Sequence, residues 1–270
     1  MSVPSVDTAA LAPSSALSDR QANIEDTNGL VDTPEAVAAL VDAIANLPTH
    51  PPSLYIDLEG IDLSRHGTIS ILQLFVLPHS RTYLIDIHNL RSAAFLTPSP
   101  KGHTLKGILE SAVVPKAFFD VRNDSDALYS LFNIDLAGIC DIQLMELATR
   151  TASKRCVNGL ARCMERNLSM TFAERQVWVD TKEAGRKLFA PERGGSYEVF
   201  NVRPMPDAIR KYCMQDVQYL PRLWQLYFSK MSAAWVASVE QEGRERVKLS
   251  QSSNFNGKGR HMALGPLYWK

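Results

Sequence analysis

Long apolar runs are missing from this sequence of 270 residues, because no uninterrupted stretch reaches the roughly 18 apolar residues of a membrane-spanning helix. The first twenty residues lack the basic and apolar regions of a secretory signal, and the single basic residue among them, Arg20, does not make an Arg-rich transit peptide. These absences predict an intracellular protein, cytoplasmic or nuclear, that is not secreted and has no membrane partner. No CxxC pair is present, which disfavours a zinc site or a disulfide framework and predicts reduced thiols at Cys140, Cys156, Cys163 and Cys213.

Net charge is absent as well, since 29 basic residues balance 29 acidic ones, but the two signs are unevenly distributed. Residues 1–64 contain one basic residue and ten acidic ones, whereas residues 150–211 contain thirteen basic and seven acidic ones. From residue 241 onward there are six basic residues and two acidic ones. The basic later half is compatible with a bound polyanion, although an ordinary solvated surface gives the same composition.

The first 30 residues are rich in Ser, Ala, Asp and Pro without periodicity, which predicts a disordered leader. Order is expected from Thr33 and Pro34, which have the residue types of an N-cap and a first helical position and precede apolar residues at helical spacing. Strands are expected next at 53–59, 68–76 and 82–87, and their short connections favour an antiparallel meander. The middle strand is apolar almost throughout, as in a strand covered on both faces.

From residue 104 onward the pattern alternates between helices and short strands. Thr104 is expected to cap a short helix, and Ala127, Leu128 and Leu131 are expected to face inward from a helix at 123–132. This alternation after a meander predicts an α/β fold with helices on both faces of the sheet. The remaining expected elements are a strand at 113–119, a short strand or turn at 139–142, helices near 143–150, 158–167, 206–228 and 230–248, and a long loop at 179–203. The residues after 248 fit either a disordered or a docked tail.

Two carboxylates lie in the first expected strand, within Leu54-Tyr55-Ile56-Asp57-Leu58-Glu59-Gly60. Because successive side chains of a strand point to opposite faces, Asp57 and Glu59 point together, about 7 Å apart along the strand. If that face is sheltered, their repulsion has to be offset by bound cations, and oxygen-only ligands suit Mg²⁺ or Mn²⁺. An edge strand with a wet polar face gives the same pattern, but a buried neighbouring strand weakens that alternative.

Two later segments contain further carboxylates. Asp120, Asp124 and Asp126 lie where a strand is expected to run into a helix, and the helix dipole alone favours a carboxylate in a first turn. Tyr212 and Asp216 lie four residues apart and therefore share one helical face, as an ordinary surface pair also does.

Taken together, the order Asp57-x-Glu59, then Asp124 four residues before Leu128, then Tyr212-x-x-x-Asp216 resembles the DEDDy group of 3′–5′ exonucleases. That group includes the ribonuclease D-like and Egalitarian-like exonuclease domains. The resemblance extends from about Leu54 to Leu223, and the flanking segments Arg122-Asn123-Asp124-Ser125-Asp126 and Arg203-Pro204 agree with it. The first of these brings the chain nearest the Egalitarian-like branch.

The resemblance implies a ribonuclease H-like mixed sheet and an exonuclease domain over residues 31–248, followed by a basic and aromatic tail over 249–270. One departure is that many relatives have a histidine shortly before the second aspartate, where this chain has Phe119-Asp120. The change removes no metal ligand, but it leaves Asp120 and Asp126 as competitors of Asp124. Asp124 is preferred because it has the spacing of the motif from Leu128.

The implied activity is metal-dependent 3′–5′ exonucleolytic hydrolysis of single-stranded RNA or DNA, with RNA favoured. Hydrolysis of a phosphodiester needs a nucleophilic water and a stabilised leaving oxygen, and two divalent cations about 3.5–4 Å apart supply both. In this hypothesis Asp57 bridges two Mg²⁺ or Mn²⁺ ions, Glu59 and Asp216 complete the nucleophile side, and Asp124 holds the leaving-group side. Tyr212 orients the water, because a phenol with a pKa near 10 is a poor base.

Substrate contacts are predicted at basic and aromatic residues, each of which also fits an ordinary surface or core position. The alternative function is a catalytically silent RNA-binding adaptor of the Egalitarian-like type, against which the retained carboxylates and tyrosine argue. A proofreading or repair nuclease finds no specific support in the sequence. The candidates for phosphate contacts are Arg122, Lys182, Arg186, Lys187 and Arg193, and those for base stacking are Phe119 and Tyr219.

Overall fold

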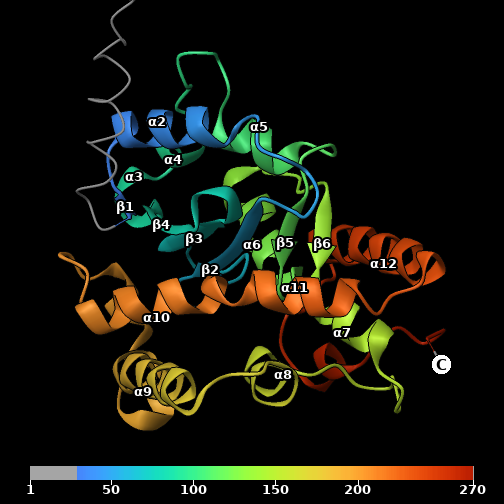
Figure 1. The fold of residues 1–270 in the computed structure, drawn as a ribbon. Coiled ribbons are helices and arrows are strands. Elements are labelled where there is room, and N and C mark those ends of the chain that lie inside the picture. Colours follow the sequence, from blue (N-terminus) through green and yellow to red (C-terminus); the bar gives the residue numbers. More distant parts are fainter. Residues whose placement is uncertain (1–28, 270) are drawn as a thin grey trace, which may run out of the picture.

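The computed structural model describes residues 29–269, and within them six strands form one mixed sheet in the order β1-β4-β3-β2-β5-β6 (Figure 1). Strands β2, β3 and β4 are antiparallel, which confirms the predicted meander. Strands β5 and β6 extend the sheet in parallel beyond β2, and β1 pairs in parallel with β4 at the opposite edge. The strands are β1 (Leu30–Val31), β2 (Leu54–Glu59), β3 (Ile71–Val76), β4 (Arg81–Asp86), β5 (Lys116–Phe118) and β6 (Ile139–Asp141).

Helices cover both faces of this sheet, which confirms the predicted α/β arrangement (Figure 1). Helices α2, α4, α5 and α6 pack on one face, and α7, α8, α10 and α11 pack on the other. Helix α12 lies beside β6 and contributes to both cores. The helices are α2 (Pro34–Ile44), α3 (Ile87–Leu90), α4 (Ala93–Leu96), α5 (Leu105–Glu110), α6 (Arg122–Phe132), α7 (Ile142–Thr149), α8 (Leu160–Asn167), α9 (Phe172–Phe189), α10 (Asp207–Gln218), α11 (Leu220–Phe228) and α12 (Ala233–Gln251), with short 3₁₀ helices η1 (Leu77–His79), η2 (Pro191–Arg193), η3 (Tyr197–Asn201) and η4 (Arg260–Ala263).

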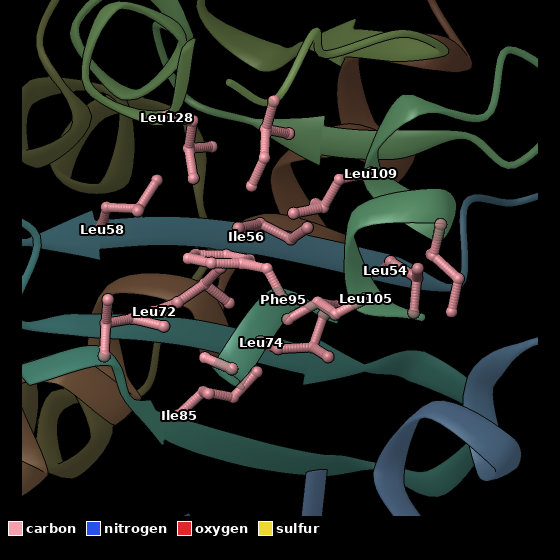
Figure 2. Packing of buried hydrophobic residues seen from close by; sticks show 14 of the residues in the cluster. Leu54, Ile56, Leu58, Leu72, Leu74, Ile85, Phe95, Leu105, Leu109 and Leu128 are labelled. Carbon is pink, nitrogen blue, oxygen red and sulfur yellow. The ribbon is translucent and has the colours of Figure 1, made fainter. Parts of the chain in front are cut away.

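The alternation of β2 determines which of its side chains enter which core. Leu54, Ile56 and Leu58 are buried in the cluster that includes side chains of β3, α5 and α6, as Figure 2 shows. Tyr55 points the other way, into the core beneath α7 and α11. β2 lies between β3 and β5 in the sheet, so the strand that contains Asp57 and Glu59 is not an edge strand.

Two helix starts follow the predicted capping chemistry. The Thr33 side chain accepts a hydrogen bond from the backbone N–H of Ala36, and Pro34 occupies the first turn of α2. The Thr104 side chain accepts one from the backbone N–H of Gly107 and so caps α5. Both caps satisfy a backbone donor that a helix leaves without a partner inside the helix itself.

The prediction of a long loop at 179–203 was wrong, because helix α9 extends to Phe189 and two 3₁₀ helices follow it. Only Trp178 and Gly185 of α9 are buried, so the apolar stripe that reveals an amphipathic helix is nearly missing. The helix is nevertheless capped, since the Thr171 side chain accepts from the backbone N–H of Glu174.

Two smaller predictions were also wrong. The helix expected at 206–228 is two helices, α10 and α11, and Pro221 lies in the first turn of the second, where its missing N–H is tolerated. Leu131 was expected to face inward from α6, but 37% of it is exposed. Ala127 and Leu128 are fully buried, as predicted.

The two ends of the chain differ in what the structure describes. The predicted disordered leader lies outside the described residues except for its last two, and Leu30 belongs to β1. After α12, residues 252–269 lie against the domain, and the Trp269 ring, 5% exposed, packs edge-on against Trp235 with ring centroids 5.1 Å apart. Among the described helices, none has the length and apolar character needed to cross a bilayer.

Candidate active site

The first two carboxylates of the site are held by the sheet. Asp57 pairs across strands with Gln73, and Glu59 pairs with Ile71, within an antiparallel ladder that runs the whole length of β2. Strand β5 pairs with the beginning of β2 on its other side. The two carboxylates therefore extend from a fixed backbone toward α10, on the face opposite the core of Figure 2.

Helix α10 supplies two more groups from a single face. Carboxylate oxygens of Asp57, Glu59 and Asp216 all lie within 4.8 Å of one another. The Tyr212 hydroxyl lies close to the Glu59 and Asp216 carboxylates. The segment before the helix is anchored to the sheet by Arg203, whose guanidinium donates to both oxygens of the Asp86 carboxylate at 2.6 and 2.8 Å.

Asp124 joins the group from the first turn of α6, at the wall of an open cavity of about 330 Å³. The structure thus brings together in one cavity all five residues that the sequence predicted to be catalytic. The cavity is lined by Asp57, Leu58, Glu59, Leu63, Phe119, Asp120, Asn123, Asp124, Leu160, Lys182, Tyr212, Asp216 and Leu220.

Burial and mutual repulsion raise the pKa values of Asp57, Glu59 and Asp124. Burial, and then the neighbouring Asp216 charge, raise the pKa of Asp57 to about 7. Burial and the charges of Asp57 and Asp216 raise the pKa of Glu59 well above its ordinary value. The pKa of Asp124 is raised by burial and by the charge of Asp57. Burial, followed by the charge of Asp216, also raises the pKa of Tyr212, so this phenol stays protonated and is a poor base.

The three aspartates at the start of α6 have different surroundings. Asp126 accepts from the backbone N–H of Arg65 at 2.8 Å and from its Nε at 2.7 Å. Asp120 lines the cavity but accepts two hydrogen bonds of 2.6 Å from the Arg122 guanidinium. Among the three, Asp124 has no ion pair with a basic side chain of the described chain, and it faces the charges of Asp57 and Glu59. The contacts therefore favour Asp124 as the fourth ligand.

Lys182 of α9 brings a positive charge into the cavity. Its Nζ lies 3.2 Å from Oδ1 of Asp216 and 5.4 Å from the centre of the Tyr212 ring. The predicted phosphate contact at this residue thus lies at the site, although on a helix rather than in a loop. Within the described residues, it is the one basic side chain that lines the cavity.

Of the other predicted substrate contacts, one lines the cavity and the rest do not. Phe119 lines the cavity with a half-buried ring, next to Asp120. Arg122 does not line it, because its guanidinium binds Asp120 and the backbone carbonyl of Met262. The remaining candidates lie outside the cavity lining: Arg186, which is near Glu183 and Glu192; Lys187, which is exposed; Arg193, which is paired with Glu183; and Tyr219, which packs against Arg222.

One residue that positions the site was missed by the sequence analysis. A Cβ atom added to Gly185 of α9 would lie 2.7 Å from three atoms of the Tyr212 side chain. The absence of a side chain therefore lets α9 approach Tyr212 closely, and it places Lys182, one turn earlier, beside Asp216. A glycine inside a helical pattern was the available signal, but the segment was interpreted as a loop.

The donors of the site fit divalent cations. Four carboxylates face one ammonium group, so their negative charge is only partly compensated within the described chain. Buried charge of this kind is normally paired or bound to metal. All the ligand atoms are oxygens, which are the atoms that Mg²⁺ and Mn²⁺ prefer. Asp57, Glu59, Asp124 and Asp216 are therefore the residues that would hold the metal.

Comparison with known families agrees with this site. The sequence profile described as 3′–5′ exonuclease matches residues 29–231, which include every carboxylate named above. The chain belongs to the 3′–5′ exonuclease family. It is accordingly a hydrolase of the nuclease class, as the resemblance implied. Among the curated proteins, none matches the sequence significantly.

Solved structures of exonucleases share the fold. Ribonuclease D of Trypanosoma brucei, in complex with the RNA U12, matches with a TM-score of 0.70 and 19% identity, over 89% of this chain and 76% of that one. Ribonuclease D of Escherichia coli, described as an exoribonuclease involved in structured RNA processing, matches with a TM-score of 0.51 and 21% identity, over 83% and 50%. NrnC of Brucella melitensis with bound Mg²⁺ matches with a TM-score of 0.51 and 18% identity, over 78% and 96%. These likenesses confirm the predicted ribonuclease H-like fold, whereas the Egalitarian-like branch stays a prediction.

Proposed function

We propose that this protein removes nucleotides from the 3′ end of single-stranded nucleic acid inside the cell, with RNA as the favoured substrate, and that it uses two divalent cations. The observation that supports this most is the cavity itself, where four carboxylates and a tyrosine surround a space open to solvent. The RNA bound in the Trypanosoma brucei ribonuclease D structure is the reason to favour RNA.

Two bound cations would supply a nucleophilic water and stabilise the leaving 3′ oxygen. Of the four ligands, Asp57 is best placed to serve both, because its carboxylate lies within 4.8 Å of those of Glu59 and Asp216 and its charge also acts on Asp124. In the hydrolysis, the water oxygen bonds to phosphorus while the bond from phosphorus to the 3′ oxygen breaks. The products are a nucleoside 5′-monophosphate and a chain shortened by one nucleotide.

The tyrosine has a separate task in this proposal. Its hydroxyl approaches Glu59 and Asp216, so it is directed toward the side of the cluster where the attacking water would lie. Because its pKa is raised by burial, Tyr212 would orient the water by a hydrogen bond rather than remove its proton. Lys182, which lies beside Asp216 and Tyr212, would attract the substrate phosphate into the cavity.

The deciding experiment incubates purified protein with 5′-labelled single-stranded RNA and DNA of one sequence, in Mg²⁺, in Mn²⁺ and in EDTA. A ladder that shortens from the 3′ end, and that is absent in EDTA and in Asp57→Asn, is the expected result. Asp180→Asn is the matched control, because Asp180 is an exposed carboxylate on α9 outside the cavity lining. Binding without shortening in either metal would instead favour the silent adaptor.

A further inference from the structure

The segment after α12 is fastened to the domain by two arginines. Arg65, in the loop between β2 and β3, donates to the carbonyls of Ser250 and Ser252 at 2.7 and 2.9 Å. The same guanidinium lies 6.0 Å from the centre of the Phe255 ring. Further along, Arg122 donates to the carbonyl of Met262 at 2.7 Å. Because Arg65 also binds Asp126 of α6, and Arg122 binds Asp120 just before that helix, the segment has a defined path.

The end of this path is tied to the strand-like residues before α8. The backbone N–H of Val157 donates to the carbonyl of Ala263 at 2.9 Å, and that of Gly265 donates to the carbonyl of Arg155 at 2.9 Å. Cys156 and Leu264 form an antiparallel bridge between these bonds. In Figure 1 this red end of the chain accordingly lies beside α8.

Two anchoring points lie at, or next to, a residue that lines the active-site cavity, and a third lies a few residues away from one. Lys258 binds Asp62, which precedes the lining residue Leu63, with Nζ and Oδ1 2.5 Å apart. Gly257 packs so closely on the lining residue Asn123 that an added Cβ would lie 2.2 Å from its Oδ1. The bridge at Cys156 lies four residues before Leu160, which also lines the cavity. Residues 257–264, which we call the C-terminal rim, thus contact Asp62, Arg122 and Asn123, each of which lines the cavity or lies next to a lining residue.

The rim is basic and exposed. Residues 252–269 contain no acidic residue, and the side chains of Lys258, Arg260 and His261 are exposed to solvent. Asp62 compensates Lys258, and the His261 ring is bonded to the carbonyl of Asn256. Arg155, on the segment paired with the rim, adds another exposed positive charge. Positive charge with exposed Asn and Gly backbone at the mouth of a nuclease cavity is suited to a phosphate backbone.

We propose that the C-terminal rim binds the sugar-phosphate backbone of single-stranded nucleic acid upstream of the 3′ end held in the cavity. This inference rests on the proposed exonuclease function and extends it to longer substrates. Lys258 and Arg260 contact phosphates that a dinucleotide is too short to present. The rim therefore raises the affinity for long oligonucleotides and does not affect the hydrolysis of dinucleotides.

The test compares Lys258→Gln/Arg260→Gln with Arg244→Gln/Lys248→Gln, which removes the same charge from exposed positions of α12 outside the cavity lining. Each protein is given a dinucleotide and an oligonucleotide of about 12 nucleotides, within the roughly 4–16 nucleotides that single-strand binding surfaces cover. Binding of the longer oligonucleotide is also measured in EDTA by fluorescence anisotropy over a range of salt concentrations.

The rim variant is expected to lose several-fold in kcat/KM on the longer substrate and nothing on the dinucleotide. Its plot of log affinity against log salt should become shallower by about 1.4, which is about 0.7 for each charge removed. An equal loss on both substrates, an unchanged slope, or the same loss in the α12 control overturns the inference. The inference is also overturned if the wild-type protein binds poly-glutamate as tightly as the oligonucleotide, because the rim would then be assigned to acidic protein partners.

Failure of the two proposals can be told apart. If the wild-type protein shortens oligonucleotides and the rim variant does so equally well, only the rim assignment is lost. If the wild-type protein binds the oligonucleotide in EDTA but cleaves nothing in Mg²⁺ or Mn²⁺, the exonuclease proposal fails while the binding data still decide on the rim. A wild-type protein without any affinity for the oligonucleotide contradicts both.

Discussion

Two groups of buried and half-buried carboxylates meet at the start of α6, and they differ in whether arginines of the chain neutralise them. Asp120, Asp126 and Asp141 are paired with guanidinium groups of Arg122, Arg65 and Arg246. The neighbouring group, Asp57, Glu59, Asp124 and Asp216, faces one lysine within the described chain. Both groups are sheltered, so the difference lies in the cations that the chain itself supplies.

The contrast is visible in the pKa values. Burial alone raises the pKa of Asp120, but its hydrogen bonds to Arg122 and the charge of Arg246 outweigh burial and hold the pKa below its ordinary value. In the other group, burial and repulsion act together and raise the pKa of Asp57 to about 7. The carboxylates that are paired with arginines stabilise the fold, whereas the carboxylates without enough basic partners are available to bind a metal ion.

The largest effect is expected from Asp57→Asn or Asp216→Asn, which removes a metal ligand. Loss of one electrostatic stabiliser commonly lowers kcat by roughly 10²–10³, and loss of a ligand shared in the cluster should abolish cleavage. Asp57→Asn also relieves repulsion, so this metal-free variant should melt no lower than the wild type near pH 8, whereas Asp216→Asn also deprives Lys182 of its ion-pair partner. Cleavage assays and thermal melts check the pair of outcomes, and undiminished turnover in either variant would refute the ligand assignment.

In the arginine-paired group, by contrast, Arg246→Met is expected to destabilise the fold. Arg246 is 4% exposed, and its Nη1 donates to Asp141 at 2.8 Å and to Gln143 at 2.9 Å. Removal of one partner of a buried pair typically destabilises a protein by about 3–5 kcal/mol. Urea denaturation should show a loss of that size. Arg244→Met, an exposed neighbour on α12, is the control and should be nearly neutral.

A smaller effect is expected where α9 meets the site. Gly185→Ala places a methyl group against the Tyr212 side chain, so either the tyrosine or the helix has to shift. Overpacking of this kind costs about 1–3 kcal/mol. Because the positions of Tyr212 and Lys182 both depend on this contact, kcat should fall by more than the loss of folded protein, measured by the melting temperature, accounts for. Gly194→Ala, which has no atoms near its added Cβ but a positive φ, separates backbone strain from crowding. Equal loss of kcat in both variants would argue against a role for the close approach.

The mildest difference is a pH dependence of metal stabilisation. The pKa of Asp57 is raised from 3.8 to about 7, so between about pH 4 and 7 the metal-free folded protein binds more protons than the unfolded chain. Its free energy of unfolding therefore falls as the pH rises through that window, and the loss is complete above it. A bound cation offsets this penalty only where the carboxylates are ionised.

Saturating Mn²⁺ should consequently raise the melting temperature more at about pH 8 than at about pH 5.5, by some 2–4 °C for each kcal/mol of stabilisation. Thermal melts with and without the metal at both pH values measure this. Asp57→Asn should flatten the difference. A shift that is the same at both pH values would mean that these acids are ionised before the metal binds.

Much of this arrangement was predictable from local patterns. Alternation assigned the faces of β2, cap residues such as Thr33 and Thr104 placed helix starts, and motif spacing placed Asp124 and Asp216 together. The surroundings of Asp126 and Asp141 were not predictable, because Arg65 and Arg246 come from positions far away in the chain. Helix α9 was missed because only Trp178 and Gly185 are buried on it.

The placement of Asp57 and Glu59 on a strand that is bonded on both sides has a consequence for how the enzyme moves and diversifies. Backbone amides of β2 that are bonded within the sheet should exchange more slowly than those of the rim, which is held by side-chain contacts and a single bridge. The rim can therefore move, or change in sequence, while the geometry of the metal ligands on β2 stays the same. If the rim binds substrate as proposed, substrate choice and chemistry reside in different parts of the fold, which can change independently.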